Sequence, residues 1–138
     1  MIDTKTRKEI IKFLQGFRCV SDKYFVHRSD GMLDLNKDKS FMISITDYEF
    51  LDLFYYVDKE GRCVVSEGIT GMRVKTVYNE DIYTVMKVFL DEHCHKLIAV
   101  MRKGIKKYGI TPRYVKVKRG DRNGKSSQRK RKQIWFYF

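Results

Sequence analysis

The chain has 138 residues, a length that suits one domain, and 43% of them are hydrophobic, enough to build a core and to exclude a chain that is disordered throughout. It carries 29 Lys and Arg against 17 Asp and Glu, which gives a formal net charge of +12. No window approaches the ~20 consecutive apolar residues of a membrane span, and no apolar stretch follows the first charged residues, so neither a membrane segment nor a signal peptide is predicted.

Cysteine usage and overall composition suggest where the protein acts. Cys19, Cys63 and Cys94 are odd in number and widely spaced, which predicts free, buried thiols in a reducing, intracellular compartment, taken here as the cytoplasm. Lys, Ile, Phe and Tyr are abundant and Ala and Pro are scarce. A/T-rich codons specify the abundant residues, so the composition fits a viral or phage gene.

The first predicted element is a helix over residues 5–15. Thr6 and Glu9 have the spacing of a capping box, in which a hydroxyl and a carboxylate satisfy the first backbone N–H groups. Apolar side chains then recur at helical spacing until Gly16, a residue typical of helix ends.

Residues 17–45 favour β structure. Within them the sequence predicts a hairpin whose strands are residues 32–35 and 41–45 and whose turn is the polar stretch between them. A second capping box begins at Thr46 and precedes apolar residues at helical spacing, which predicts a helix over 47–58.

Two further β-rich runs, residues 62–66 and 72–77, flank a loop that contains glycine, and they predict a second hairpin. The loop includes Gly68 and Gly71 in a GxxG pattern, which also occurs in KH-type nucleic-acid-binding domains. There the pattern joins two helices, whereas here it joins β-rich runs, so a hairpin turn is favoured.

Apolar residues recur at three- and four-residue steps from Ile82 to Tyr108. This pattern predicts one long helix that Asn79 caps and Gly109 ends. At 1.5 Å per residue it would be about 40 Å long. Gly104 lies inside it and is a candidate interruption.

Positive charge is concentrated in residues 102–132. This stretch holds 14 of the 29 Lys and Arg but one of the 17 acidic residues, so the rest of the chain has 15 basic and 16 acidic residues and is nearly neutral. Such concentrated positive charge is the electrostatic footprint of a phosphate-binding surface.

The C-terminal stretch predicts a β-hairpin. Residues 113–119 and 133–138 have strong β propensity, and the polar residues between them contain no large apolar side chain. We expect the base of the hairpin to join the core while residues 119–132 form a flexible basic loop. The predicted fold class is therefore α+β: a single compact domain over 1–138 with antiparallel strands, one long helix and this C-terminal hairpin.

The long cationic side chains near this hairpin are candidates for nucleic-acid binding, because Arg bonds phosphate oxygens bidentately and Lys acts as a point charge. They are Lys116, Lys118, Arg119, Arg122, Lys125, Arg129, Lys130, Arg131 and Lys132. Tyr114 and Trp135 are candidate base-stacking platforms, and the alternative interpretation places both rings in the core. The predicted function is non-enzymatic binding of RNA or DNA through the phosphate backbone, with no cofactor.

Three alternatives remain open from the sequence. One is a small viral or phage inhibitor of a host nucleoprotein complex, whose basic loop meets nucleic acid or an acidic protein partner. Another is a metal-dependent nuclease, for which the candidate carboxylates are scattered and match no motif: Asp47, Asp52, Asp58, Glu60 and Glu67. In the third, the charge run only improves solubility.

A metal site is not predicted. His93, Cys94 and His95 are the residue types that bind zinc, but the sequence has no local Cys-x-x-Cys pair, and adjacent residues of a helix point to different faces.

Overall fold

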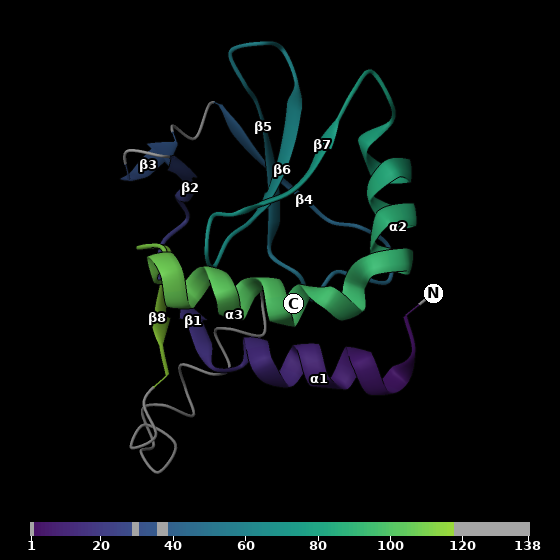
Figure 1. Ribbon diagram of the computed structural model, residues 1–138, viewed down its shortest axis with the longest axis vertical. Coiled ribbons are helices and arrows are strands. Elements are labelled where there is room, and N and C mark those ends of the chain that lie inside the picture. Colours follow the sequence, from purple (N-terminus) through teal and green to yellow (C-terminus); the bar gives the residue numbers. More distant parts are fainter. Residues whose placement is uncertain (1, 29–30, 36–38, 118–138) are drawn as a thin grey trace.

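The computed structural model describes residues 2–28, 31–35 and 39–117 (Figure 1). The fold is mixed α+β with antiparallel sheets and a long helical segment, as predicted. The helical elements are α1 (Thr4–Leu14), α2 (Ile82–His93), the 3-10 helix η1 (Cys94–Lys96) and α3 (Leu97–Tyr108). The strands are β1 (Phe17–Cys19), β2 (Tyr24–Arg28), β3 (Gly31–Leu35), β4 (Ser40–Ile43), β5 (Leu53–Val57), β6 (Cys63–Glu67), β7 (Arg73–Val77) and β8 (Tyr114–Lys116).

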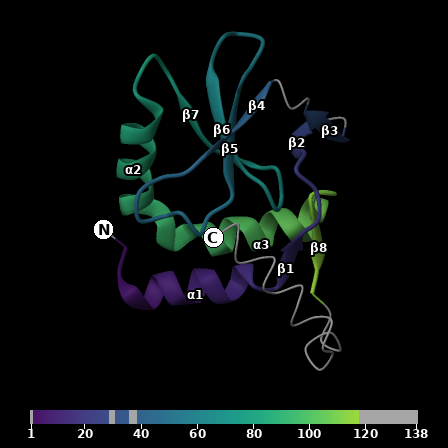
Figure 2. The ribbon, with the colours of Figure 1, turned by 180° about the vertical axis from the view of Figure 1, so that it is seen from behind.

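Within the described residues the strands form separate antiparallel sheets. Strands β4, β5, β6 and β7 pair in that order, and β2 pairs with β3 as a hairpin. Strand β1 pairs with β8, the most distant strand in sequence, with Cys19 opposite Tyr114. Both ribbon views show the β1–β8 pair beside the C-terminal end of α3, and α1 running alongside α3 (Figures 1 and 2).

The main hydrophobic core lies between the helices and the four-stranded sheet. Ile10 of α1, Leu90 of α2 and Met101 of α3 are each at most 3% exposed, and they pack with buried residues of the sheet such as Leu53 and Val65. All of these helices therefore contribute to one core, and each presents its apolar stripe inward.

A second, smaller apolar cluster covers the other face of β5. Phe54 is fully buried there and stacks on Tyr24 of β2, with ring centroids 4.5 Å apart. Side chains of a strand alternate between faces, so Leu53 enters the main core while Phe54 enters this cluster. Strand β5 is consequently apolar at successive positions rather than at alternate ones.

This double burial explains why the helix predicted over 47–58 is wrong. The chain instead turns at Asp47, whose φ is +73°, and turn hydrogen bonds join Tyr48 N to Ile45 O (2.8 Å) and Leu51 N to Tyr48 O (3.0 Å). Strand β5 follows. A run of adjacent apolar residues fits a helix and a doubly buried strand equally well, and strand pairing on both sides of β5 decides between them.

The hairpin predicted between residues 32–35 and 41–45 is also wrong. Strand β3 pairs with β2, and β4 pairs with β5. Tyr24 and Val26 of β2 are buried against Phe54, and β3 pairs with β2 along its whole length, from Tyr24 opposite Leu35 to Arg28 opposite Gly31. The hairpin predicted from 62–66 and 72–77 is confirmed as β6 and β7, with the GxxG as its turn.

The N-terminal helix is confirmed as α1, one residue earlier than predicted. Asp3, not Thr6, is its N-cap: the Thr6 backbone N–H donates to Asp3 Oδ1 at 2.8 Å, and the Thr6 hydroxyl donates to Asp3 Oδ2 at 2.9 Å. The hydroxyl that suggested a capping box therefore serves as a donor inside the first turn.

The long helical segment from Ile82 to Tyr108 is confirmed, but its details differ from the prediction. Asp81 rather than Asn79 caps it, since Asp81 Oδ2 accepts from the Thr84 backbone N–H at 3.1 Å. The direction changes at η1, not at Gly104, so α2 and α3 do not form a straight rod (Figure 1). Gly104 is buried within α3, where a Cβ would collide with Met72, and it serves close packing.

Candidate nucleic-acid interface

Strand β8 fixes the point from which the basic stretch leaves the core. Its pairing with β1 is extended at both ends, by Val20 N to Arg113 O and by Val117 N to Gly16 O, each 2.8 Å. Lys116 lies at the end of β8 and is exposed. The first residue of the predicted phosphate-binding set is thus held on a paired strand, which limits where its side chain can reach.

Most of the predicted binding residues follow Lys116 in sequence and lie outside the described residues. They are Lys118, Arg119, Arg122, Lys125, Arg129, Lys130, Arg131, Lys132 and Trp135. The predicted return strand over 133–138 and the predicted flexible loop over 119–132 also lie outside the described residues, so the C-terminal hairpin stays a prediction.

Tyr114, a candidate stacking platform, is 8% exposed and belongs to the main core. Its hydroxyl donates to Asp52 Oδ2 at 2.5 Å. Burial, with the negative charge of Asp52 beside it, raises the pKa of the Tyr114 hydroxyl far above its ordinary value. The ring therefore occupies the position expected under the alternative interpretation, that of a core aromatic.

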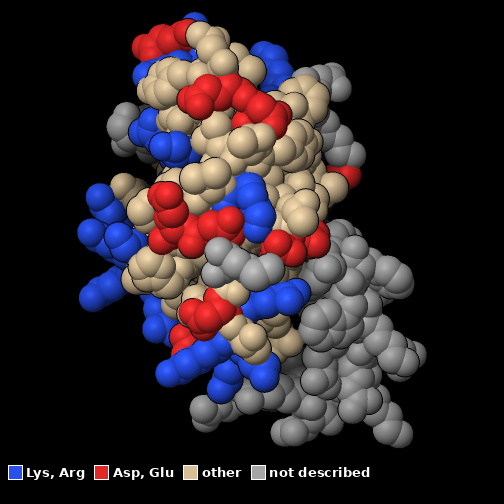
Figure 3. Space-filling view, turned by 90° about the vertical axis from the view of Figure 1, so that its right-hand side faces the viewer, with Lys and Arg blue, Asp and Glu red and all other residues tan. Residues whose placement is uncertain are grey.

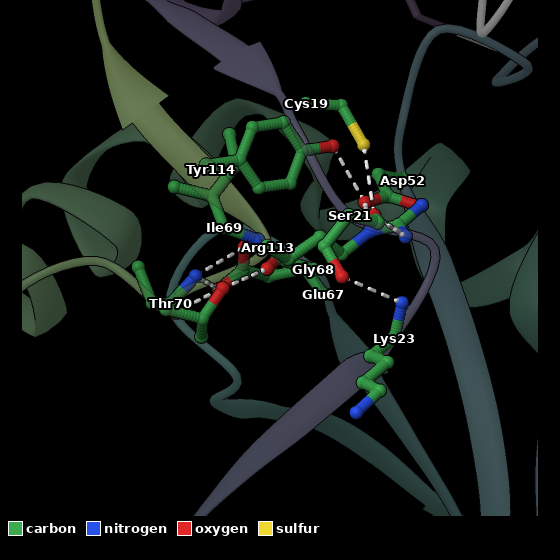
Figure 4. A network of polar contacts seen from close by, with 11 residues as sticks. Cys19, Ser21, Lys23, Asp52, Glu67, Gly68, Ile69, Thr70, Arg113 and Tyr114 are labelled. Carbon is green, nitrogen blue, oxygen red and sulfur yellow. Dashed lines mark hydrogen bonds and ion pairs between the residues drawn. The ribbon is translucent and has the colours of Figure 1, made fainter. Parts of the chain in front are cut away.

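Arg113, the neighbour of Tyr114, is the cation of the basic stretch that the fold uses internally. It is 5% exposed and forms a two-point ion pair with Asp52, Nε to Oδ2 at 2.7 Å and Nη2 to Oδ1 at 3.2 Å (Figure 4). Its Nη1 donates to Ser21 O at 2.7 Å, and its guanidinium carbon lies 4.2 Å from the centroid of the Tyr24 ring.

Burial disfavours the charged form of Arg113, but the hydrogen bonds and charge of Asp52 outweigh burial and raise the pKa of the guanidinium. Arg113 consequently stays charged while it is shielded from solvent phosphate. It joins β8 to the residues after β1 and to the turn before β5, and so it positions the strand rather than a ligand. Sequence reasoning missed this role because Asp52 is 61 residues away and no local pattern connects the pair.

The loop between β6 and β7 packs against the same network. Gly68 N donates to Asp52 O at 2.8 Å, and a Cβ at Gly68 would collide with the Asp52 carboxylate. From the other side, Thr111 Oγ1 donates to Gly68 O at 2.8 Å. Gly68 is therefore explained by the close approach of Asp52, which leaves the GxxG pattern with a structural role.

Glu67, at the start of this loop, is a buried carboxylate. It accepts hydrogen bonds from the backbone N–H groups of Ile69 (2.8 Å) and Thr70 (3.0 Å) and from the Thr70 hydroxyl. Burial raises the pKa of Glu67 from its ordinary value of 4.5 to about 8, although the backbone donors favour the charged form. Its partners all belong to the loop, so Glu67 acts on loop conformation.

The carboxylates considered for a nuclease do not form one cluster in the structure. Each has another side chain as its partner: Asp47 has Lys87, Asp52 has Arg113, Asp58 and Glu60 have Arg62, and Glu67 has Thr70. Among the described residues, no three His, Cys, Asp or Glu side chains form a group that could hold a metal ion.

The three cysteines differ in burial, and His93, next to Cys94, contacts an aromatic ring. All three thiols are free, and Cys94 is buried while Cys19 and Cys63 are half-buried, so the predicted burial holds fully for Cys94 alone. His93 contacts the ring of Phe89, with centroids 5.0 Å apart.

Comparison with protein-family models, curated proteins and solved structures finds no match to this chain. Over the ranges that the structure describes, no helix combines the length and apolar character needed to cross a membrane.

Proposed function

We propose that the protein binds nucleic acid without catalysing a reaction, through phosphate contacts made by the basic segment, residues 116–132. One observation carries this proposal: residues 102–132 hold nearly all of the excess positive charge of the chain. A nearly neutral domain with one strongly basic stretch is typical of a protein that binds a polyanion.

The structure adds support in two respects. The basic segment begins on β8, which β1 and the Arg113–Asp52 pair hold in place. The described carboxylates that a nuclease would need are engaged elsewhere. Because β8 is held in place, less conformational entropy is lost when Lys116 binds a phosphate.

The proposal is tested by replacing Arg129, Lys130, Arg131 and Lys132 with Gln and measuring binding to fluorescent RNA and DNA over a salt series. Removing one cation that binds a phosphate should reduce the slope of log K against log salt by about 0.9 on duplex DNA or about 0.7 on a single strand. Affinity should fall for every sequence tested, because interactions with the phosphate backbone carry no direct sequence information.

A matched control replaces four exposed lysines outside the basic stretch, Lys5, Lys8, Lys39 and Lys59, with Gln. It lowers the net charge by the same amount and should weaken binding much less. Equal decreases in affinity for both variants would contradict a localised interface. A parent protein that binds no nucleic acid at low salt would reject the proposal and favour an acidic protein partner, as in the inhibitor alternative.

A further inference from the structure

Helix α3 presents a row of cations opposite its buried side. Leu97, Met101 and Gly104 are buried against the core. The cations that project outward form what we call the α3 basic face: Arg102, Lys103, Lys106 and Lys107, all exposed. With 3.6 residues per turn these four occupy one side of the helix, in two pairs that are each one turn apart.

The fold does not neutralise this face. From residue 93 to residue 120 the sequence contains no Asp or Glu, and within the described residues the four side chains take part in no ion pair. Like charges four residues apart destabilise a helix by ~0.2–0.5 kcal/mol per pair, offset in part by the helix dipole at the last turn. The charge is therefore not explained by stabilisation of α3 alone.

Helix α2 shows the contrasting arrangement. Its Lys87 pairs with Asp47 at 3.0 Å and with Asp91 at 3.1 Å, and its His93 lies 3.6 Å from Glu92. Seen from the α2 side, acidic and basic side chains alternate, while Lys and Arg gather along the left margin of the view (Figure 3). Helix α3 thus differs from α2, whose lysine is paired with acidic side chains.

The α3 basic face is also fixed in position. Close packing of Gly104 against Met72 holds the middle of the helix, and Arg102 lies over the Phe13 ring of α1 at 5.4 Å. After Gly109 the chain bonds to the β6–β7 loop through Thr111 N to Ile69 O at 2.8 Å, and then enters β8. The face and the start of the basic segment are therefore parts of one rigid arrangement (Figures 1 and 2).

The aromatic rings near these cations already have partners within the protein. Tyr108 of α3 packs on His27, with ring centroids 4.4 Å apart, and lies 5.0 Å from Lys107 Nζ. Phe13 of α1 lies beneath Arg102 and packs on Phe17, with ring centroids 5.5 Å apart. Tyr114 is buried. Proteins that bind single strands combine cations with exposed rings on which bases stack, whereas duplex backbones are bound by charge alone.

We infer that the α3 basic face is a second phosphate-binding surface, and that its partner is the backbone of duplex nucleic acid. This inference rests on the proposed function and extends it from the basic segment 116–132 to a rigid helix. The segment supplies cations that follow β8, and α3 supplies cations with a set spacing.

The test is the double variant Lys103→Gln/Lys106→Gln, chosen because these two exposed side chains take no part in the described ion pairs or ring contacts. The matched control is Lys39→Gln/Lys59→Gln, with the same charge change at exposed lysines away from α3. Binding to a 20-base-pair duplex and to a single strand of equal length is measured by fluorescence anisotropy over a salt series.

The α3 variant should bind the duplex about 10- to 30-fold more weakly near 0.15 M salt, with a slope of log K against log salt smaller by about 1 to 2. The control should change duplex affinity by less than about threefold. The decrease in affinity for the single strand should be smaller than for the duplex. Circular dichroism and thermal unfolding should match the parent for both variants.

Different results would overturn different claims. If α3 and control variants show equal decreases in duplex affinity, or if binding to the single strand weakens as much as binding to the duplex, the inference about α3 is wrong. If in addition the Arg129–Lys132 variant still binds more weakly than the parent, the proposed function stands without it. If the parent binds neither probe at low salt, both fail, and an acidic protein is the partner that the charge serves.

Discussion

Arg113 and Lys103 lie in the same stretch without acidic residues, yet the fold treats their charges in opposite ways. Arg113 is 5% exposed, and its guanidinium donates hydrogen bonds to the Asp52 carboxylate and to Ser21 O. Lys103 is exposed and unpaired within the described residues. A buried charge must be matched inside the protein because desolvation is costly, while an exposed charge is stabilised by water and is accessible to a ligand. The net charge of residues 102–132 therefore overstates the number of its cations that can contact a phosphate.

The largest effect is expected from breaking the buried pair. Arg113→Met leaves the Asp52 carboxylate without its cation and should lower the free energy of unfolding by ~3–5 kcal/mol, measured by urea denaturation. Combining it with Asp52→Asn should cost less than the sum of the two single changes, because neither charge remains buried alone. Additive costs would show that the two side chains do not act as a pair.

Glu67 is a second buried ionisable group, which accepts hydrogen bonds from backbone donors and has no cation as its partner. Its pKa is raised to about 8, so between pH 4.5 and 8 the folded state keeps a proton that the unfolded state releases. The free energy of unfolding should fall as pH rises through this window, by up to ~1.4 kcal/mol per pH unit.

Glu67→Gln should flatten that pH dependence, because the amide does not titrate and its oxygen still accepts from the Ile69 and Thr70 N–H groups. Glu49→Gln, at an exposed side chain, is the control and should keep the parent slope. An unchanged slope in Glu67→Gln would assign the pH dependence to other groups.

A smaller effect is expected at Gly68, which gives the Asp52 carboxylate its space. Gly68→Ala should destabilise by ~1–3 kcal/mol, because the added Cβ overlaps that carboxylate and displaces it from Arg113. Gly61→Ala is the comparison: it has a φ of +78° but open space around it, so it should cost only ~1 kcal/mol. Thermal unfolding of both variants measures the difference.

The smallest effect is expected from single lysine substitutions that compare α3 with α2. Lys103→Gln should change the free energy of unfolding by no more than ~0.5 kcal/mol, since the side chain is exposed and unpaired within the described residues. Lys87→Gln should cost up to ~1 kcal/mol, because Lys87 bridges Asp47 and Asp91 and lies 5.1 Å from the Tyr48 ring centroid. If Lys103→Gln costs more than Lys87→Gln, the charge on α3 serves the fold.

Local patterns in the sequence determined several elements of this protein. The 3.6-residue periodicity of α1 and of residues 82–108, and the strand, turn and strand of β6 and β7, were predictable because their signals lie within a few residues of one another. The concentration of positive charge was also readable, since it depends only on composition.

Tertiary structure alone decided the rest. Strand β5 became a strand because both of its faces are buried, and β1 pairs with β8 across most of the chain. Arg113 is buried beside Asp52, which the fold brings from 61 residues away, while the packing of α3 leaves the α3 basic face exposed. Burial and long-range pairing are properties of the folded chain, and no local window of residues contains them.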